Sequence, residues 1–96
     1  MPADPPPAWV LTRRRAIGAR IRTAREAAKL TQETLGELVG ADRKTINRIE
    51  HAISDPRLSL LILIADAIGV PLADLMRESP GLSATGDADR PGRSGD

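Results

Sequence analysis

The stretch TQETLGELVGADRKTINRIEH, residues 31–51, decides the fold of this chain. It holds two short segments whose apolar residues recur at helical spacing, and Gly40 stands between them. The residues expected to point inward are Leu35, Leu38, Val39, Ile46 and Ile49. Two short helices joined by a tight turn that contains glycine make a helix-turn-helix.

The ends of both segments carry typical helix signals. Thr31 and Asp42 are good N-cap residues, because their side-chain oxygens can accept hydrogen bonds from the first free backbone N–H groups. Thr34 stands where a full capping box would place Glu or Gln. Gly40 ends the first helix, since glycine takes the left-handed conformation at little steric cost.

Further helices are predicted on both sides of this stretch. One runs from about Arg13 to Lys29 with Thr12 as its N-cap, and another from about Leu58 to Ile68, closed by Gly69. Pro71 suits the first position of a short fifth helix, LADLM. The apolar stripe of the first of these helices consists of Ile17, Ile21, Ala24 and Ala28. The chain is therefore predicted to be all-α, a compact five-helix bundle that contains a helix-turn-helix.

The two ends of the chain differ in composition from its centre. Residues 1–9 are rich in proline and residues 78–96 in Gly, Ser, Pro and Asp. Neither end has enough apolar surface to offset chain entropy, so we expect a disordered lead and a disordered tail. One domain over residues 10–77 remains.

Composition excludes several classes of protein. The chain has 96 residues, no Cys and one His, which excludes disulfide frameworks and the usual zinc motifs. Trp9 is the single aromatic residue, too few for stacking on single-stranded nucleic acid. No nucleophile is paired with a base, so an enzyme is not expected. No cofactor, metal, membrane span or signal segment is indicated, and we expect a cytoplasmic protein.

The net charge of +1 hides an asymmetry. Residues 11–30 carry seven basic side chains and one acidic one, whereas residues 58–96 carry three basic and six acidic ones. The basic segment either serves a polyanion or is a solvated helix face, and charge alone does not separate the two.

Residues 16–76 resemble the lambda-repressor-like helix-turn-helix family, also called Cro-type or xenobiotic-response-element type. The resemblance rests on LTQETLGELVG at 30–40, TINRIE at 45–50 and IADAIGVP at 64–71. It implies binding to double-stranded DNA, with the third helix in the major groove. The matching positions for base contacts are Arg43, Lys44, Asn47 and Arg48. Those for phosphate contacts are Thr31, Gln32 and Thr45, and Arg25 with Glu50 match a structural salt bridge.

The chemistry of the third helix supports this implication independently. Arg43 and Lys44 would be its first two residues, where the helix dipole disfavours each cation by roughly 0.3–1 kcal/mol. An anionic partner would relieve that conflict, and the alternative is two exposed cations tolerated at small cost. Arg and Lys can donate to guanine, and Asn can pair with adenine.

Three positions depart from the family pattern. Gly36 replaces the usual Ala, which keeps the helices close but weakens its helix by roughly 0.5–1 kcal/mol. Ala52 stands where Gly often follows the recognition helix, so the turn there needs a different path. Arg57 stands where the helix predicted at 58–68 usually has a Ser or Thr N-cap. Asp55 with Pro56 is an alternative cap for that helix.

The helix predicted at 58–68 is apolar on every face, which a small domain cannot bury alone. Its core side is predicted to consist of Leu58, Leu61, Ile64, Ala65 and Ile68. Leu60, Leu63 and Ala67 then form a candidate dimer or partner face. A homodimer, a protein partner, or residues 9–11 folding back are the three possible covers.

The sequence thus predicts a small transcriptional regulator, a repressor that binds a nearly palindromic DNA site as a homodimer. The first alternative is an antitoxin-like protein whose apolar helix face binds another polypeptide. The second is an interaction module that kept the fold and lost DNA binding.

Overall fold

The structure, a computed structural model, describes residues 5–77, and within that range it contains five α-helices and no strand. The helices are α1 (Ala8–Ala27), α2 (Gln32–Val39), α3 (Arg43–Glu50), α4 (Leu58–Ile68) and α5 (Leu72–Met76). The predicted all-α, five-helix architecture is confirmed. The expected disorder of the C-terminal tail falls outside the described residues.

The first helix begins earlier than the sequence predicted. α1 starts at Ala8 with Pro7 at its N-cap, so Ala8 and Trp9 of the supposed proline-rich lead are helical. Thr12 lies inside the helix, where its hydroxyl donates to the Ala8 carbonyl at 3.2 Å, and it caps nothing. A proline is well suited to a helix start, because the missing N–H has no intrahelical partner there.

The helix-turn-helix has the predicted caps. The Thr31 hydroxyl accepts from the Thr34 backbone N–H at 2.9 Å, and Asp42 Oδ1 accepts from the Thr45 N–H at 2.8 Å. The bonds from Thr45 lower the pKa of the Asp42 carboxyl, and the charges of Lys44 and Arg48 add a smaller effect in the same direction. Both caps fix where the helices begin and therefore how α3 is oriented.

Four helices end on a residue in the left-handed conformation. Gly40 and Gly69 close α2 and α4 with φ of 78° and 92°, as predicted. Lys29 and Ala52 do the same after α1 and α3 with φ of 63° and 57°. After α3, the Ile53 N–H donates to the Arg48 carbonyl at 2.8 Å, and the Ala52 N–H to the Ile49 carbonyl. Ala52 therefore keeps the turn that glycine would make, and no different path is needed.

The last two helices begin without side-chain caps. Arg57 is the N-cap residue of α4 and makes no capping bond, so neither the usual Ser or Thr nor Asp55 supplies one. Pro71 sits just outside α5, at its N-cap, and not at the first helical position as predicted.

The core lies where the five helices meet. Its fully buried large side chains come from every helix: Ile21, Leu35, Ile46, Ile64 and Leu75. Two residues predicted to be in the core are not, since Leu38 is 58% exposed and Leu58 is 61% exposed. Both lie on the outer arcs of their helices, where no neighbouring helix covers them.

Two glycines allow the helices to approach closely. A Cβ at Gly18 of α1 would lie 2.5 Å from the Glu50 carbonyl oxygen of α3. A Cβ at Gly36 of α2 would overlap the Ala41 carbonyl oxygen in the turn. The sequence predicted only that a small residue is needed at position 36. The structure requires glycine there, because even alanine would force the turn to shift.

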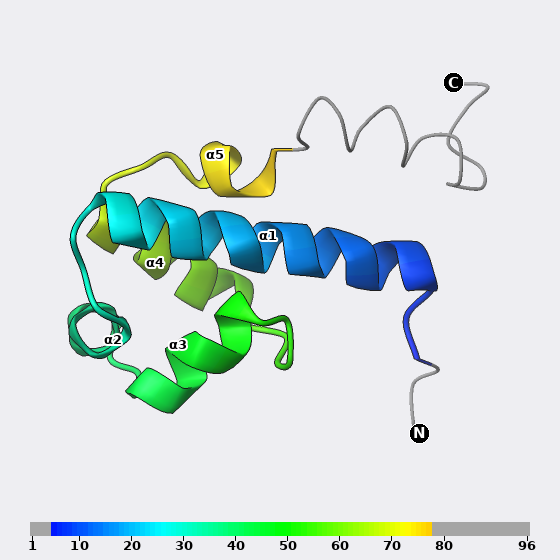
Figure 1. Cartoon of the computed structure of the whole chain (residues 1–96), viewed down its shortest axis with the longest axis horizontal. Coiled ribbons are helices and arrows are strands. Elements are labelled where there is room, and N and C mark those ends of the chain that lie inside the picture. The colour runs from blue at the N-terminus through cyan, green and yellow to red at the C-terminus, as the bar shows by residue number, and fades with distance from the viewer. Residues whose placement is uncertain (1–4, 78–96) are drawn as a thin grey trace.

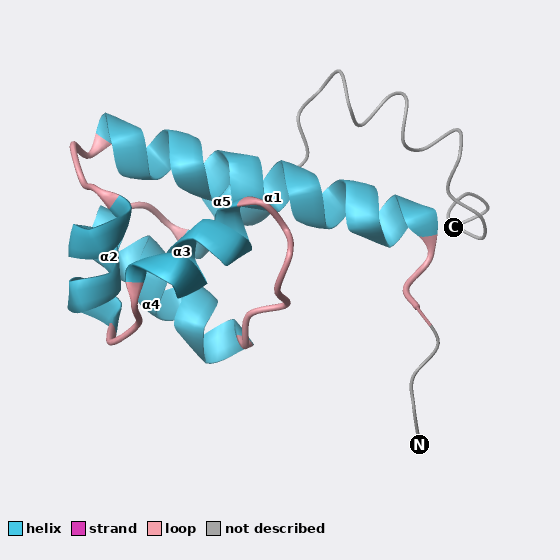
Figure 2. Ribbon diagram, turned by 60° about the horizontal axis from the view of Figure 1, so that its bottom comes forward, coloured by secondary structure: helices cyan, strands magenta, loops and turns pink. Residues whose placement is uncertain are grey.

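The helices are arranged around the length of α1. Figure 1 shows α1 running across the molecule, with α2, α3 and α4 on one side of it and α5 on the other. The N-terminal end of α1 extends past the remaining helices, which the rotated view in Figure 2 also shows. Within residues 5–77 no helix is both long enough and apolar enough to cross a membrane.

Candidate nucleic-acid interface

The helix α3 has one buried face and one polar face. Ile46, Ile49 and Glu50 point into the protein and are buried. The opposite face carries Lys44, Arg48 and His51, all exposed, and it is flanked by exposed Arg43 and half-buried Asn47. The four predicted base-contact residues therefore share one side of a single helix, which a major groove can accommodate.

The start of α3 concentrates positive charge. Arg43 and Lys44 are its first two residues, as predicted, and its first turn contains no acidic side chain. The helix dipole places further partial positive charge there, and Asp42 at the N-cap is the nearest compensating anion. This end of α3 is therefore an electropositive site open to solvent.

The three predicted phosphate contacts do not lie together. Thr31 and Gln32 stand at the start of α2, where backbone N–H groups favour anions. Thr45 lies on the other flank of α3, where it lines a hollow with Ser59 and Leu63 of α4. The two sets therefore bracket α3.

A buried ion pair holds α3 against α1. Arg25 Nε donates to Glu50 Oε2 at 2.6 Å, and Arg25 Nη2 donates to Glu50 Oε1 at 3.1 Å. Arg25 Nη1 also donates to the Leu30 carbonyl at 2.7 Å. The Glu50 hydrogen bonds, opposed by burial, raise the pKa of Arg25 above its already high ordinary value. Two parallel bonds fix the distance and the rotation of the two helices.

Gln32 takes part in the same network. Its Nε2 donates to Glu50 Oε1 at 3.1 Å, so this side chain links α2 to the end of α3. An amide has two N–H donors and an oxygen, and one bond to Glu50 leaves capacity for another partner. Sequence reasoning assigned Gln32 to phosphate alone and missed its structural role. Its spacing of 18 residues from Glu50 gave no local signal.

A polar hollow lies beside α3, between α1 and α2. It is lined by Arg22, Arg25, Leu30, Thr31, Gln32, Glu33, Arg43, Asn47 and His51. Arg22, which the sequence reading did not single out, is exposed and pairs with Glu26 at 3.2 Å. His51 Nδ1 lies 2.9 Å from the Asn47 carbonyl oxygen at the end of the helix. Arg22 and His51 thus line the same hollow as the predicted residues Gln32, Arg43 and Asn47.

The candidate partner face of α4 is composed differently from the prediction. Leu60 and Ala67 are half-buried and pack against the core, so they do not form an outer face. Leu63 is 49% exposed, and Ile62 and Leu58 are exposed beside it. Residues 9–11 do not cover this face, because they belong to α1 and the three α4 side chains remain open.

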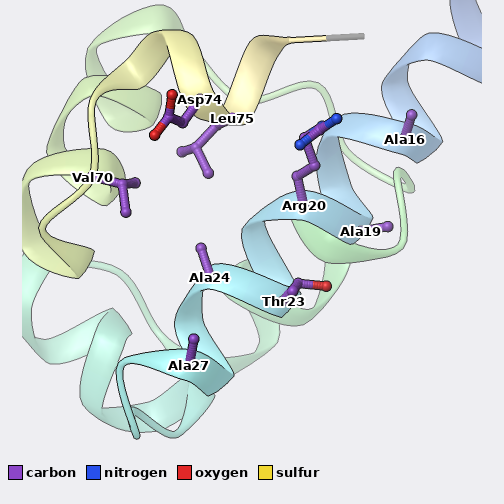
Figure 3. A pocket seen from close by; sticks show the side chains of 9 residues that line it. All are labelled: Ala16, Ala19, Arg20, Thr23, Ala24, Ala27, Val70, Asp74 and Leu75. Atoms are coloured by element: carbon purple, nitrogen blue, oxygen red, sulfur yellow. The ribbon is translucent and has the colours of Figure 1, made fainter. Parts of the chain in front are cut away.

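A second hollow lies away from α3, between α1 and α5. Figure 3 shows its lining: Ala16, Ala19, Arg20, Thr23, Ala24, Ala27, Val70, Asp74 and Leu75. Most of these side chains are small and apolar. No residue of α3 lines this hollow. Among the residues that the structure describes, no cluster of His, Asp or Glu could hold a metal ion.

These features define a helix-turn-helix DNA-binding domain: two capped helices, a glycine turn, and an exposed polar face on the second helix. A model of the helix-turn-helix family of the Cro/C1 type matches residues 21–75, more than half of the chain. The chain belongs to this family, whose members are transcription regulators that bind DNA and are not enzymes.

Solved structures show the same fold. The P22 c2 repressor, crystallised in complex with a synthetic operator in the presence of Tl⁺, is 27% identical, with a TM-score of 0.61. That match covers 66% of this chain and 96% of the repressor chain. No curated protein matches the chain by sequence.

Two further matches cover more of this chain. The clp gene regulator ClgR from Corynebacterium glutamicum is 26% identical with a TM-score of 0.69, over 88% of this chain and 86% of ClgR. The hypothetical transcription factor NHTF from Neisseria is 27% identical with a TM-score of 0.64, over 88% and 94%.

Proposed function

We propose that this protein is a sequence-specific repressor that inserts α3 into the major groove of double-stranded DNA. The observation that carries the proposal is the outer face of α3. Four side chains with base-reading chemistry lie together there: Arg43, Lys44, Asn47 and Arg48. The buried Arg25–Glu50 pair and the Asp42 cap hold that face in a defined orientation.

Charge placement supports the same proposal. Two cations at the start of a helix are unfavourable in the free protein, and a phosphate backbone would compensate them. In this proposal Thr31 and Gln32 at the start of α2 contact phosphate on one side of α3, and Thr45 contacts it on the other; their positions on the two flanks of α3 support this. The repressor role is supported by the likeness to the P22 c2 repressor, which was solved with an operator.

We further propose that the protein binds DNA as a homodimer. One recognition helix contacts only a few base pairs, and a two-fold dimer doubles the contact with half-sites about 34 Å apart. The exposed apolar side chains Leu58, Ile62 and Leu63 of α4 offer a surface for association. Selection of bound sequences from a random DNA pool tests both points, because it returns base preference and half-site spacing together.

Substitutions on α3 test the reading residues. Arg48→Ala or Lys44→Ala is expected to cost about 1–3 kcal/mol on the selected site and to relax preference at one position per half-site. Gln32→Ala is expected to weaken binding to all sequences more evenly. Titration of labelled duplexes at fixed salt measures both effects.

Arg77→Ala is the matched control, because Arg77 follows α5 and pairs with Asp74. It removes one exposed arginine and leaves α3 untouched. If the Arg48 and Lys44 variants kept full affinity and unchanged preference, α3 would not be the reading helix.

A second function is favoured by the α4 surface alone. Exposed Leu58, Ile62 and Leu63 also suit a foreign polypeptide, as in an antitoxin-like protein whose DNA binding serves autoregulation. The purified protein distinguishes the two. A chain that self-associates through α4 and binds its operator without any other polypeptide contradicts this alternative.

A further inference from the structure

The N-terminal part of α1 extends past the other helices, and Arg14 from it lines a hollow with Asp55 and Met76 of the bundle. α1 has 20 residues and therefore spans about 30 Å, whereas the helices beneath it have 8 to 11. Its contacts with the core involve Ile17, Ile21 and Ala24. Val10 and Leu11 are half-buried, and they are not among the residues packed against the core. We call residues 8–15 the α1 arm; Figure 1 shows it extending past the other helices.

The chemistry of the arm is apolar and strongly basic. Trp9, Val10 and Leu11 are followed by Arg13, Arg14 and Arg15. Val10 lies seven residues before Ile17, so it continues the inner face of α1 beyond the bundle. The described chain contains no acidic residue before Glu26. The arm thus has an apolar tip, Trp9 to Leu11, followed by three arginines, of which Arg15 is exposed and the other two are half-buried.

The exposed face of α4 has complementary chemistry. Leu58 is 61% exposed, Ile62 48% and Leu63 49%. Asp66, also exposed, lies one turn beyond Ile62 and is the only charged residue within α4, and exposed Arg57 precedes Leu58 at the N-cap. Three large apolar side chains and one carboxylate therefore face solvent together.

The arm cannot cover this face within one chain. It is continuous with the rest of α1, and Gly18 brings α1 into direct backbone contact with the end of α3. That contact fixes the direction in which the arm leaves the bundle. Leu58, Ile62 and Leu63 of α4 each keep about half or more of their surface open to solvent in the described chain.

Charge selects the partner among surfaces of this chain. Arm against arm would bring six arginines together, and α4 against α4 would bring two Asp66 carboxylates together. Arm against α4 pairs arginines with a carboxylate and brings the apolar tip of the arm against the apolar side chains of α4. In a two-fold dimer such a contact forms twice, because each residue pair is repeated by symmetry.

We propose that the α1 arm of one copy docks on the exposed α4 face of a second copy, and that the second copy reciprocates. Each copy then contributes its arm to the other copy, and the arm serves as a dimerisation element. The role of this contact in DNA binding rests on the proposed function, because a homodimer matches the two half-sites of a palindromic site. Self-association itself is measured without DNA.

Mixing two variants tests the reciprocal contact. Leu11→Glu damages the arm, and Ile62→Glu damages the α4 face. Each variant alone loses both contacts, and its dimer dissociation constant in sedimentation equilibrium is expected to rise at least tenfold. In an equal mixture, an intact arm meets an intact α4 face once per heterodimer, so the average mass is expected to exceed that of either variant alone.

Leu38→Glu is the matched control, because Leu38 is an exposed leucine on α2. It is expected to leave the dissociation constant unchanged. Circular dichroism checks that each variant is folded. If Leu11→Glu or Ile62→Glu unfolds, Arg15→Glu and Asp66→Arg replace them, because both residues are exposed and support no core contact.

Three outcomes overturn the proposal. The first is a wild type that remains monomeric at millimolar concentration. The second is a wild type that self-associates while the arm variants associate equally well, which would point to α4 pairing with itself. The third is a mixture no heavier than its components.

Trp9 provides an independent readout, since it is the only tryptophan and lies on the arm. Its emission is expected to shift to shorter wavelength as the wild type is concentrated, in parallel with the mass. Emission that does not change with mass overturns the proposal. A dimer with these properties that failed to select any DNA sequence would contradict the proposed function and leave the arm contact standing.

Discussion

At the scale of single residues, Ala52 occupies a backbone conformation that disfavours it. Its φ of 57° is left-handed, where a Cβ crowds the following carbonyl. Ala52→Gly is expected to stabilise the protein by about 1 kcal/mol, because glycine adopts this conformation without that strain. Chemical denaturation measures the change.

Gly69→Ala is the opposite substitution at a comparable position and serves as the control, because it adds a Cβ at a left-handed residue. Gly69 closes α4 with φ of 92°, and a Cβ there would meet no other atom within 4 Å. Strain alone is therefore expected to destabilise it. Equal free energies of unfolding for Ala52→Gly and the wild type would show that the turn after α3 carries no strain.

The Arg25–Glu50 pair also acts at the residue scale. Both side chains are buried, and Glu50 accepts from Arg25 twice and from Gln32 once. Glu50→Ala strands the arginine charge, so we expect a loss of roughly 3–5 kcal/mol in the free energy of unfolding. Thermal unfolding in the absence of DNA measures it.

The control is the double variant Arg25→Met with Glu50→Leu. It removes both charges and keeps side-chain volume, so it is expected to be more stable than Glu50→Ala. A Glu50→Ala protein with an unchanged melting temperature would show that the pair contributes nothing.

At the scale of elements, the start of α3 is expected to respond to acid. The folded pKa of Asp42 lies below its ordinary value of 3.8, so the ionised cap favours the folded state. This contribution is fully present above about pH 4 and is lost as the pH falls through the lowered pKa. Asp42→Asn keeps a capping oxygen and does not titrate. Its melting temperature is expected to fall less steeply with acidification than that of the wild type, and equal slopes would contradict this.

The packing of elements depends on the two contact glycines. Gly36→Ala is expected to destabilise by about 1–3 kcal/mol, because a Cβ there overlaps the backbone of the turn. Gly18→Ala is expected to do the same by pushing α1 away from α3. In Gly40→Ala the Cβ meets nothing within 4 Å, so left-handed strain is its only cost. Denaturant midpoints compare the three, and a Gly36→Ala protein as stable as the wild type would mean that the turn adjusts freely.

At the scale of the whole molecule, the five helices within residues 5–77 share one core. Its buried apolar residues run from Ile21 to Leu75. Deletion of residues 80–96 is therefore expected to leave the melting transition unchanged. A lower melting temperature of the shortened chain would show that the domain extends past residue 77.

Local chemistry is what made the helix-turn-helix predictable. Thr31, Gly40 and Asp42 act on their own neighbours within a few residues, so their roles can be recognised from sequence. Ile46 and Ile49 are also where periodicity placed them. The same rule failed for Ala52, because its departure from glycine changed the energy of the turn and not its path.

Periodicity placed Leu61, Ile64, Ala65 and Ile68 of α4 correctly on the core side, and it was wrong at the border positions Leu58 and Leu60. When a helix is apolar all round, every face is a possible core face, and only the positions of the neighbouring helices decide. Leu60 is covered and Leu58 is open for that reason. The start of α1 is a related case, since residues 8–12 are not among those packed against the core and the core spacing does not mark them as helical.

The sequence by itself determined the fold class, the caps of α2 and α3, and the polar face of α3, because short-range hydrogen bonds and helical spacing specify them. Tertiary structure alone decided the geometry of the Arg25–Glu50–Gln32 network, the backbone approaches at Gly18 and Gly36, and the exposed face of α4. These features join residues far apart in the chain. Their distances depend on how whole helices pack, and local sequence does not encode that packing.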